Sequence, residues 1–227
     1  MSNLAIIPAR GGSKRIPKKN IKDFLGKPII AYSIETALKS GLFDEIIVST
    51  DDPEISDVAI KYGAKVPCFR SSETSNDFAS LSDVMNEVIL FYKNRNIRFD
   101  YVCCILPTTP LVTMENLKLG YGLITNSEFD SIRPIVRYSY PIQRAFRYNK
   151  NGGVELFNPE HLWSRSQDLE PAYHDAGQFY WFYFEKGLTG TNRGAFIIPE
   201  KDVQDIDTLE DWDIAELKYK MRNESKL

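Results

Sequence analysis

The chain has 227 residues, of which 43% are hydrophobic and 12% aromatic. This content is enough to bury one sizeable core and excludes a disordered tail or a small disulfide-held protein. The formal net charge is only -3, so no overall charge attracts the chain to nucleic acid or to an anionic membrane.

Strand-like and helix-like segments alternate through the first two thirds of the chain, which predicts an α/β fold with a largely parallel sheet. Strands are expected at 4–7, 46–48, 65–69 and 101–106, and helices at about 28–41, 52–63 and from 80 onwards. Asp52 precedes a proline at a first helical position, and Ser80 with Asp83 resembles a capping box. These signals indicate where two of the helices begin.

The alternation fails after about Arg137. Residues 149–153 form a strong turn signal between 144–148 and 154–157, and they predict a hairpin that leaves the main sheet. We expect an excursion of about 138–165 within a single domain of 1–227. Such an excursion suits an arm that contacts a partner, or a lid over substrate.

The residue pattern in the last part of the chain predicts two strands and a helix. Six consecutive aromatic residues, 179–184, are expected to form a core strand, and 195–198 a last short strand. A helix is expected to begin at Thr208, with Leu209, Trp212, Ala215 and Tyr219 facing the core.

Cysteine and histidine form no recognisable metal or catalytic pattern. Cys68, Cys103 and Cys104 lack metal-ligand spacing, and we interpret them as small core residues in a reducing compartment. With only His161 and His174 present, a multi-histidine zinc site is excluded and a Ser/His/Asp triad is poorly supported. No segment resembles a signal peptide or a membrane span, so we expect a soluble, cytoplasmic protein.

A basic loop follows the first strand. Six basic residues and no acidic residue lie between Arg10 and Lys22. Gly11 and Gly12 let consecutive backbone N–H groups point at one anion, while Lys14 and Lys19 add charge. The spacing matches neither a Walker loop nor a dinucleotide fingerprint. The loop therefore indicates a triphosphate site, with a merely solvated basic loop as the alternative.

An acidic segment lies near the other end of the chain. Asp205 and Asp207 flank Ile206, so in an extended segment both carboxylates project from one side while Ile206 packs inward. One or two carboxylates beside a triphosphate suit Mg²⁺. The alternative is helix capping, because Asp207 and Thr208 directly precede a helix.

Several motifs together resemble one enzyme family. The segment 7–14, followed by Lys19 and Asn20, looks like the nucleotide-binding signature of the CMP-sialic acid synthetase family, cytidylyltransferases that activate acidic sugars. Segments 47–51, 70, 79–80, 107–111 and 205–208 fall in the family's order and approximate spacing. The resemblance spans nearly the whole chain. It implies a Rossmann-like nucleotidyltransferase fold and a homodimer in which the protruding hairpin arm reaches the neighbour's sugar pocket.

The resemblance also implies roles for the matching residues. The nucleotide would be bound by Ala9, Arg10, Gly11, Gly12, Ser13, Lys14, Lys19, Asn20, Arg70 and Ser80, the last two facing the cytidine. Arg10, Lys14, Lys19 and Asp207 would carry catalysis, and Asp205 with Asp207 would bind Mg²⁺. The anomeric hydroxyl of the sugar would attack the α-phosphorus of CTP, giving a CMP-sugar for glycan or flagellin glycosylation and releasing pyrophosphate. The general base stays open between Asp207, a metal-bound water and Asp175.

Departures from the family pattern concern the sugar. Leu106 stands where sialic acid enzymes carry Gln, and segments 165–171 and 173–181 are similar to the branch that activates pseudaminic acid, a nine-carbon sugar with a 6-deoxy end. The sugar-side candidates are Leu106, Arg165, Gln167, Tyr173, His174, Asp175 and Gln178. For His174 a structural role is the alternative. Other acidic sugars, a nucleic-acid-binding module and a nucleotide-binding domain without catalysis are the competing functions.

Overall fold

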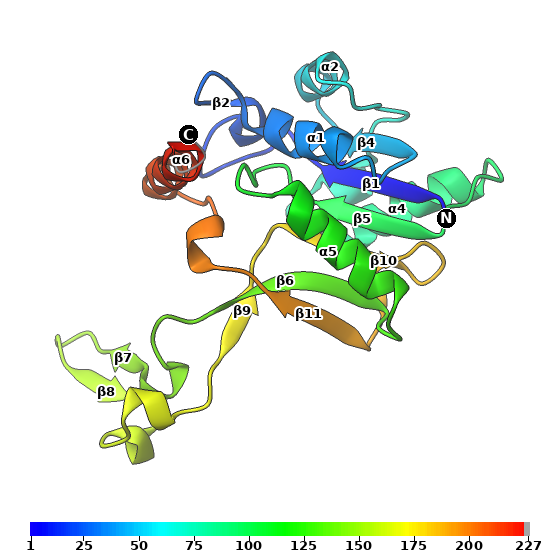
Figure 1. Cartoon of the computed structure of the whole chain (residues 1–227). Coiled ribbons are helices and arrows are strands. Elements are labelled where there is room, and N and C mark those ends of the chain that lie inside the picture. Colours follow the sequence, from blue (N-terminus) through cyan, green and yellow to red (C-terminus); the bar gives the residue numbers. More distant parts are fainter. Residues whose placement is uncertain (225–227) are drawn as a thin grey trace.

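A seven-stranded sheet forms the centre of the protein in a computed structural model that describes residues 1–224 (Figure 1). The strand order is β11-β6-β10-β5-β1-β4, with β9 paired to β6 outside this path. The strands are β1 (Asn3–Pro8), β4 (Glu45–Ser49), β5 (Tyr101–Ile105), β6 (Ser131–Arg137), β9 (Tyr173–Asp175), β10 (Phe179–Tyr183) and β11 (Arg193–Ile197). β1 lies parallel to β4 and β5, and β11 lies parallel to β6, whereas β9 and β10 run in the opposite direction. The predicted α/β fold with a mostly parallel sheet is confirmed.

Helices cover both faces of this sheet. α1 (Ile29–Ser40), α2 (Pro53–Lys61) and α5 (Met114–Thr125) pack on one face, and α4 (Leu81–Lys93) packs on the other. Successive strand residues point to opposite faces, so Cys103 joins the first core cluster and Cys104 the second. Both thiols are buried and unbonded to each other, as predicted, while Cys68 is half-buried.

Helix ends follow the signals in the sequence. The Asp52 side chain accepts hydrogen bonds from the backbone N–H groups of Glu54 and Ile55 at the start of α2. Ser80 and Asp83 form the predicted capping box of α4. α1 ends at Gly41, which adopts a left-handed conformation with φ of 66°.

Three expectations differ from the structure. The strand at 65–69 is wrong, because Lys65 and Phe69 make only isolated bridges to the sheet and Pro67 between them has no N–H to donate. α5 was not predicted, since two glycines weaken its helical pattern. One of them, Gly120, is needed because a Cβ there would lie 2.9 Å from the Trp181 ring. Leu209 is 61% exposed instead of facing the core.

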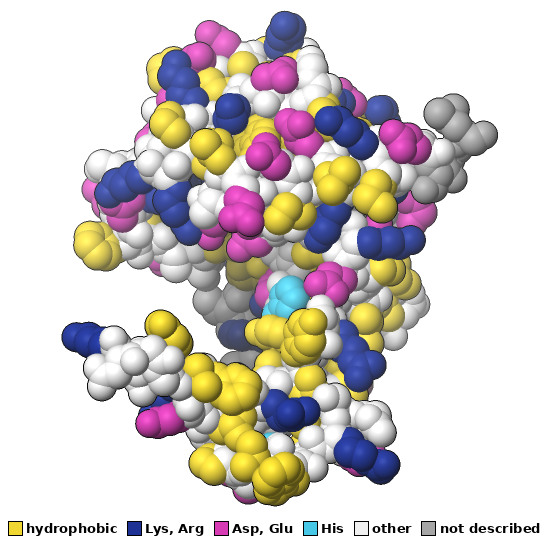
Figure 2. Space-filling model, turned by 90° about the vertical axis from the view of Figure 1, so that its left-hand side faces the viewer, with side chains coloured by type: hydrophobic (Ala, Val, Ile, Leu, Met, Phe, Trp, Pro, Cys, Tyr) yellow, Lys and Arg dark blue, Asp and Glu magenta, His cyan; other side chains and the backbone are white. Residues whose placement is uncertain are grey.

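The chain leaves the sheet between β6 and β9 and forms a protruding arm (Figure 1). β7 (Phe146–Tyr148) and β8 (Val154–Leu156) pair as the predicted antiparallel hairpin, closed where Asn149 N donates to Gly153 O at 2.9 Å. Large hydrophobic side chains gather on the surface of this arm (Figure 2). The hairpin is therefore confirmed, whereas its part in dimerisation stays a prediction.

The remaining elements are short or lie at the end of the chain. They are η1 (Lys19–Ile21), β2 (Asp23–Phe24), β3 (Lys27–Pro28), α3 (Ser72–Ser75), η2 (Ile142–Arg144), η3 (Pro159–His161), η4 (Ser166–Asp168), η5 (Gly187–Thr189), η6 (Glu200–Asp202) and α6 (Leu209–Glu224). Across residues 1–224, no helix combines the length and hydrophobicity that crossing a membrane requires.

A small hydrophobic cluster joins the two ends of the chain. Ile16 of the basic loop and Phe24 of β2 are buried against Ile206 and Trp212, and the Phe24 and Trp212 rings meet edge to face at 5.6 Å. Ile206 is 1% exposed, so it packs inward as predicted. Burying a large apolar side chain contributes about 1.5–3 kcal/mol. This cluster holds the acidic segment beside the basic loop.

Candidate active site

The basic loop forms the wall of a cavity of about 410 Å³. Because β1 and β5 are parallel neighbours, the loops at their carboxyl ends meet and enclose it. Its lining residues are Pro8, Arg10, Ser13, Lys14, Arg15, Ile16, Lys19, Asn20, Pro107 and Thr108. All of them are basic or uncharged, which favours an anionic ligand. The structure thus brings together five residues predicted for the triphosphate and adds Arg15.

A second cavity of about 230 Å³ adjoins the first through Pro8 and Arg10, which line both. Arg70 and Ser80, expected to face the cytidine, line this second cavity. Leu106, expected on the sugar side, lies here with them. Arg10 therefore stands at the junction between a basic cavity and a more mixed one.

Internal hydrogen bonds fix the shape of the basic loop. Asn20, which is 5% exposed, donates its side-chain amide to Arg10 O at 2.9 Å, and Ser13 N donates to Gly11 O at 2.9 Å. Gly11 N donates to Asp51 Oδ1 at 2.9 Å, so it points at this carboxylate, contrary to the expectation that it points at a bound anion. Ala9 is fully buried, and its N–H donates to Ser49 O. The walls of the cavity are consequently formed by side chains more than by free N–H groups.

Asp207 lies against the cations of the cavity. Its carboxylate pairs with Arg15 NH1 at 2.6 Å and with Lys19 Nζ at 3.6 Å. Lys19, whose side chain is only 19% exposed, also donates to Ile206 O at 2.6 Å. The acidic segment and the basic loop therefore form one site.

Thr208 and Asp211 cap the N-terminus of α6. Asp211 Oδ2 accepts a hydrogen bond from Thr208 N at 2.8 Å, and Asp211 N donates to Thr208 Oγ1 at 3.2 Å. Hydrogen bonds from Thr208 lower the pKa of the Asp211 carboxyl. Thr208 thus caps α6 with Asp211 as its reciprocal partner, so the capping alternative is confirmed for Thr208, whereas the Asp207 carboxylate pairs with Arg15 and Lys19.

The carboxylates of Asp205 and Asp207 suit a magnesium site in which the ligand provides further oxygen atoms. Among residues 1–224, no group of three or more His, Cys, Asp or Glu side chains could hold an ion. Mg²⁺ differs from most protein-bound metals in accepting one or two carboxylates and completing its shell with phosphate and water. Asp207 at the cavity edge, with the exposed Asp205 two residues away, suits an ion shared with a phosphate ligand.

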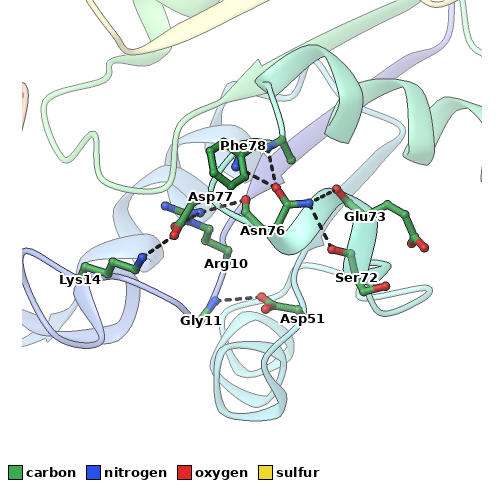
Figure 3. A network of polar contacts seen from close by, with 10 residues as sticks. Arg10, Gly11, Lys14, Asp51, Ser72, Glu73, Asn76, Asp77 and Phe78 are labelled. Atoms are coloured by element: carbon green, nitrogen blue, oxygen red, sulfur yellow. Dashed lines mark hydrogen bonds and ion pairs between the residues drawn. The ribbon is translucent and has the colours of Figure 1, made fainter.

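Asp77 is a site residue that sequence reasoning missed. Its carboxylate contacts Arg10 NH1 at 3.0 Å and Lys14 Nζ, and so joins two predicted triphosphate residues (Figure 3). The hydrogen bond and charge of Lys14, followed by the charge of Arg10, lower the pKa of Asp77. Its place between Arg70 and Ser80, two matched positions, was the available signal.

Arg70 and Ser80 are both held by neighbouring elements. Arg70 NH2 donates to Ser49 O at 2.7 Å and its Nε to Ser49 Oγ at 3.2 Å, which fixes the guanidinium at the end of β4. Burial lowers the pKa of Arg70, although an arginine stays protonated at neutral pH. The Ser80 hydroxyl is the N-cap of α4, so any contact to a ligand adds to a structural role.

Asp175 is the centre of a polar cluster on the sheet. Its carboxylate pairs with Arg133 NH1 at 3.0 Å and accepts hydrogen bonds from Gly177 N at 2.8 Å and Tyr180 Oη at 3.2 Å. The Arg133 guanidinium also lies 4.9 Å from the centre of the Tyr180 ring. Arg133 was missed because it lies among apolar residues of β6. Its Nε is buried without a hydrogen-bond partner among the described residues.

The other sugar-side candidates lie in several places. Gln178 is 2% exposed and donates to Asp202 O at 2.7 Å. His174 Nδ1 lies 2.9 Å from Asp175 O, and its ring packs against Tyr138, contacts that suit a structural histidine. The exposed Tyr173 is at the start of β9.

Arg165 and Gln167 belong to the arm. Arg165 Nε pairs with Asp168 at 2.6 Å, and Gln167 lines a separate cavity of about 260 Å³ between the arm and β6. Neither lines the two cavities beside the basic loop, and Figure 1 shows the arm projecting away from β1. Within one described chain these two residues are therefore not brought to Arg10.

Comparison with known proteins agrees with this geometry. A family model described as cytidylyltransferase matches residues 4–210. The pseudaminic acid cytidylyltransferases of two Campylobacter jejuni strains, serotypes O:2 and O:23/36, are 46% and 47% identical over 99% of this chain and of each relative. A CMP-N,N'-diacetyllegionaminic acid synthase of Legionella pneumophila is 31% identical over 99% of both chains.

Solved structures show the same fold. A CMP:2-keto-3-deoxy-manno-octonic acid synthetase complexed with CTP superposes with a TM-score of 0.69 at 19% identity, covering 99% of this chain and 100% of that one. This similarity confirms the nucleotidyltransferase fold that the sequence motifs implied. With residues 4–210 matched and relatives aligned over their full length, the chain belongs to the cytidylyltransferase family.

Proposed function

We propose that this enzyme transfers CMP from CTP to the anomeric hydroxyl of pseudaminic acid and releases pyrophosphate. The observation that carries the proposal is the 46–47% identity to two pseudaminic acid cytidylyltransferases over 99% of all three chains. Relatives named for other acidic sugars are more distant. The legionaminic acid enzyme is 31% identical, and an N-acylneuraminate cytidylyltransferase of Oncorhynchus mykiss, of which this chain covers 49%, is 36% identical.

The cavity cations bind the triphosphate in this proposal. Arg10, Lys14, Arg15 and Lys19 surround the 410 Å³ cavity and neutralise the charge that builds up on the leaving pyrophosphate. Arg70 and Ser80 border the adjoining cavity and contact the nucleoside. Arg10, which lines both cavities, lies beside the phosphate that links the two parts of the nucleotide.

Asp207, with Asp205, holds Mg²⁺ in this proposal. The ion, when bound, neutralises phosphate charge and helps orient the reacting groups. Asp207 is paired with Arg15 and Lys19, and the phosphates of the ligand provide these two cations with new partners. The carboxylate is then available to the metal without leaving a charge unpaired.

Asp175 recognises the sugar in this proposal and does not take the hydroxyl proton. Three donors, Arg133, Gly177 N and Tyr180 Oη, already occupy its carboxylate. Arg133 adds planar donors suited to a carboxylate or acylamido group. Leu106, packed on the same core cluster as Tyr180, provides an apolar wall that suits a 6-deoxy sugar.

A second copy of the chain covers the arm in this proposal. Six of its large hydrophobic side chains are more than half exposed, namely Tyr140, Phe146, Tyr148, Val154, Phe157 and Trp163. An exposed apolar surface of this kind marks an interaction site. A partner's arm would also bring Arg165 and Gln167 to a sugar site that they do not reach within one chain.

Pyrophosphate release tests the proposed function. The purified enzyme with Mg²⁺ is given each of the four nucleoside triphosphates, with pseudaminic acid, N-acetylneuraminic acid or N,N'-diacetyllegionaminic acid as acceptor. We expect release with CTP and pseudaminic acid only. Comparable turnover of N-acetylneuraminic acid would refute the choice of sugar, and release with no sugar at all would refute the reaction.

A further inference from the structure

The Asp77 carboxylate bridges two cations of the basic cavity. Arg10 NH1 contacts one oxygen at 3.0 Å, and Lys14 Nζ contacts the other (Figure 3). Arg10 NH1 also donates to Asn76 O at 3.1 Å. Each oxygen faces a separate cation, as the oxygens of a bound phosphate would. Asp77 therefore stands in for one phosphate group of the proposed ligand.

The segment that carries Asp77, residues 71–80, has a defined shape of its own. Asn76 Oδ1 accepts hydrogen bonds from Phe78 N at 2.8 Å and Ala79 N at 3.0 Å (Figure 3). Glu87 of α4 accepts from Ser71 N at 2.9 Å and from the Thr74 hydroxyl. Glu87 thus holds the first end of the segment, the Ser80–Asp83 capping box holds the second, and the Asn76 bonds shape the turn between them, all independently of the basic loop.

The same segment forms a wall of the adjoining cavity. Asn76, Asp77, Ala79 and Ser80 all line the 230 Å³ cavity, whereas Lys14 lines the 410 Å³ cavity. The contacts of Asp77 and Asn76 O with Arg10 and Lys14 are therefore a direct link between the two cavities. An anion that takes Arg10 and Lys14 away from Asp77 changes how this wall is attached.

The bridge is weak enough to be exchanged. The side chains of Arg10, Lys14 and Asp77 are 38%, 77% and 42% exposed. Ion pairs with this exposure typically change an equilibrium constant by no more than about fivefold. A triphosphate carries several charges against the single charge of Asp77, so it competes successfully for both cations.

We propose that Asp77 is an internal competitor of the phosphate ligand at the nucleotide site. It pairs with Arg10 and Lys14 when no nucleotide is bound and gives them up to the triphosphate, so that nucleotide binding releases residues 71–80 from the basic loop. The inference rests on the proposed function for the identity of the displacing anion. It goes beyond that function because it assigns to one acidic side chain a competition with the substrate.

Binding of tripolyphosphate, which lacks both nucleoside and sugar, tests this exchange. Calorimetry on the full chain should show that Asp77→Asn binds tripolyphosphate about two- to fivefold more tightly than wild type, because the internal competitor is gone. Asp77→Glu keeps the charge and should restore wild-type affinity. Glu73→Gln, an equal loss of charge on the same segment away from both cations, is the matched control and should leave affinity unchanged.

A fluorescent reporter follows the release of the segment. Phe78 is 97% exposed next to Asp77, so Phe78→Trp introduces a probe at the moving position without opening the core. Tripolyphosphate should change the emission of this probe in the Asp77 background and leave it unchanged in the Asp77→Asn background. For CTP turnover, Asp77→Asn should lower the KM for CTP about two- to fivefold, and Asp77→Glu should return the KM to the wild-type value.

Each outcome supports or overturns the proposal. Equal or weaker binding of tripolyphosphate by Asp77→Asn, a silent probe at saturation, or no binding by wild type would overturn it. Pyrophosphate release by wild type is a separate readout, so a failure of the proposed function is distinguished from a failure of the exchange. An enzyme that binds tripolyphosphate as described but accepts no sugar retains the exchange and loses the function.

Discussion

At the scale of single residues, the site consists of cations that each have an internal carboxylate partner. Arg10 and Lys14 face Asp77, while Arg15 and Lys19 face Asp207. These carboxylates reduce the repulsion between four positive side chains that lie close together when no ligand is bound. A ligand that carries both phosphate and a divalent cation can replace all four contacts at once.

Asp207 provides the first residue-scale prediction. Asp207→Asn should lower turnover of CTP and sugar by at least about 100-fold, because one metal ligand and its charge are lost. CTP binding should be partly retained, since the cavity cations stay in place. Initial rates of pyrophosphate release measure the effect. Asp213→Asn, the same change on the exposed surface of α6, is the control, and near-normal activity of Asp207→Asn with Mg²⁺ would contradict the metal assignment.

The two glycines of the loop provide a matched pair for a second prediction. A Cβ at Gly11 would lie 2.6 Å from Asp52 Oδ2, whereas a Cβ at Gly12 meets nothing within 4 Å. Gly11→Ala should therefore lower the free energy of unfolding by about 1–3 kcal/mol, because Asp52 must move from the start of α2. Urea denaturation measures the loss. Gly12→Ala should leave stability unchanged, and equal losses in both variants would contradict the packing explanation.

Some residues of the site could be predicted from the sequence and others could not, depending on whether neighbouring residues in the chain indicate their place. That Arg10, Lys14, Lys19 and Asn20 line one cavity could be predicted, because the residues lie within one short motif. The contacts of Asp77 and Arg133 could not, because their partners come from distant strands or loops, although the position of Asp77 between Arg70 and Ser80 was a signal. The reciprocal bonds between Asp211 and Thr208 could not be predicted either, because they depend on where the helix begins.

At the scale of elements, predictions succeeded where the cap or turn is encoded locally. The capping box at Ser80 and the turn at 149–153 specify one structure from a few neighbouring residues. The strand expected at 65–69 failed because pairing depends on a distant partner and Pro67 interrupts it. α5 escaped prediction because Gly120 serves the packing of Trp181 and weakens the helical pattern.

Ser80 provides the element-scale prediction, because its hydroxyl caps α4 and Ser80 also lines the 230 Å³ cavity that we propose for the nucleoside. Ser80→Ala should lower the free energy of unfolding by about 1 kcal/mol through loss of the cap. Ser80→Asn should restore stability, since Asn caps as well as Ser. If the hydroxyl contacts cytidine, both variants should raise the KM for CTP. If the KM for CTP is raised in Ser80→Ala but normal in Ser80→Asn, the KM changes together with stability. This outcome would show that Ser80 has the structural role alone.

At the scale of the whole molecule, the arm and the active site are separate in one chain. The exposed hydrophobic side chains of the arm need a cover, and Arg165 and Gln167 lie on the same arm. The sequence could predict the hairpin but not its placement, because the path from β6 to β9 depends on the sheet. Assembly of two chains is the step that would complete the sugar side.

Light scattering after gel filtration checks this assembly. Wild type should elute with twice the chain mass of 26.0 kDa. Trp163→Ser combined with Tyr148→Ser should shift the mass toward one chain and raise the KM for the sugar more than the KM for CTP. Leu90→Ser, which removes an apolar side chain that is more than half exposed on α4, should change neither. A wild-type enzyme that is monomeric and active would remove the role of the arm.

The hydrophobic cluster of Ile16, Phe24, Ile206 and Trp212 also determines when the enzyme can work during its synthesis. Lys19 and Ile206, which are joined by a hydrogen bond, are separated by 187 positions in the chain. A ribosome must therefore synthesise and release the chain as far as Ile206 before this contact with the basic loop can form. Contacts of such high sequence separation form late in folding. A chain that ends before Asp207 consequently lacks the carboxylate partner of Arg15 and Lys19, although Asp77 already pairs with Arg10 and Lys14.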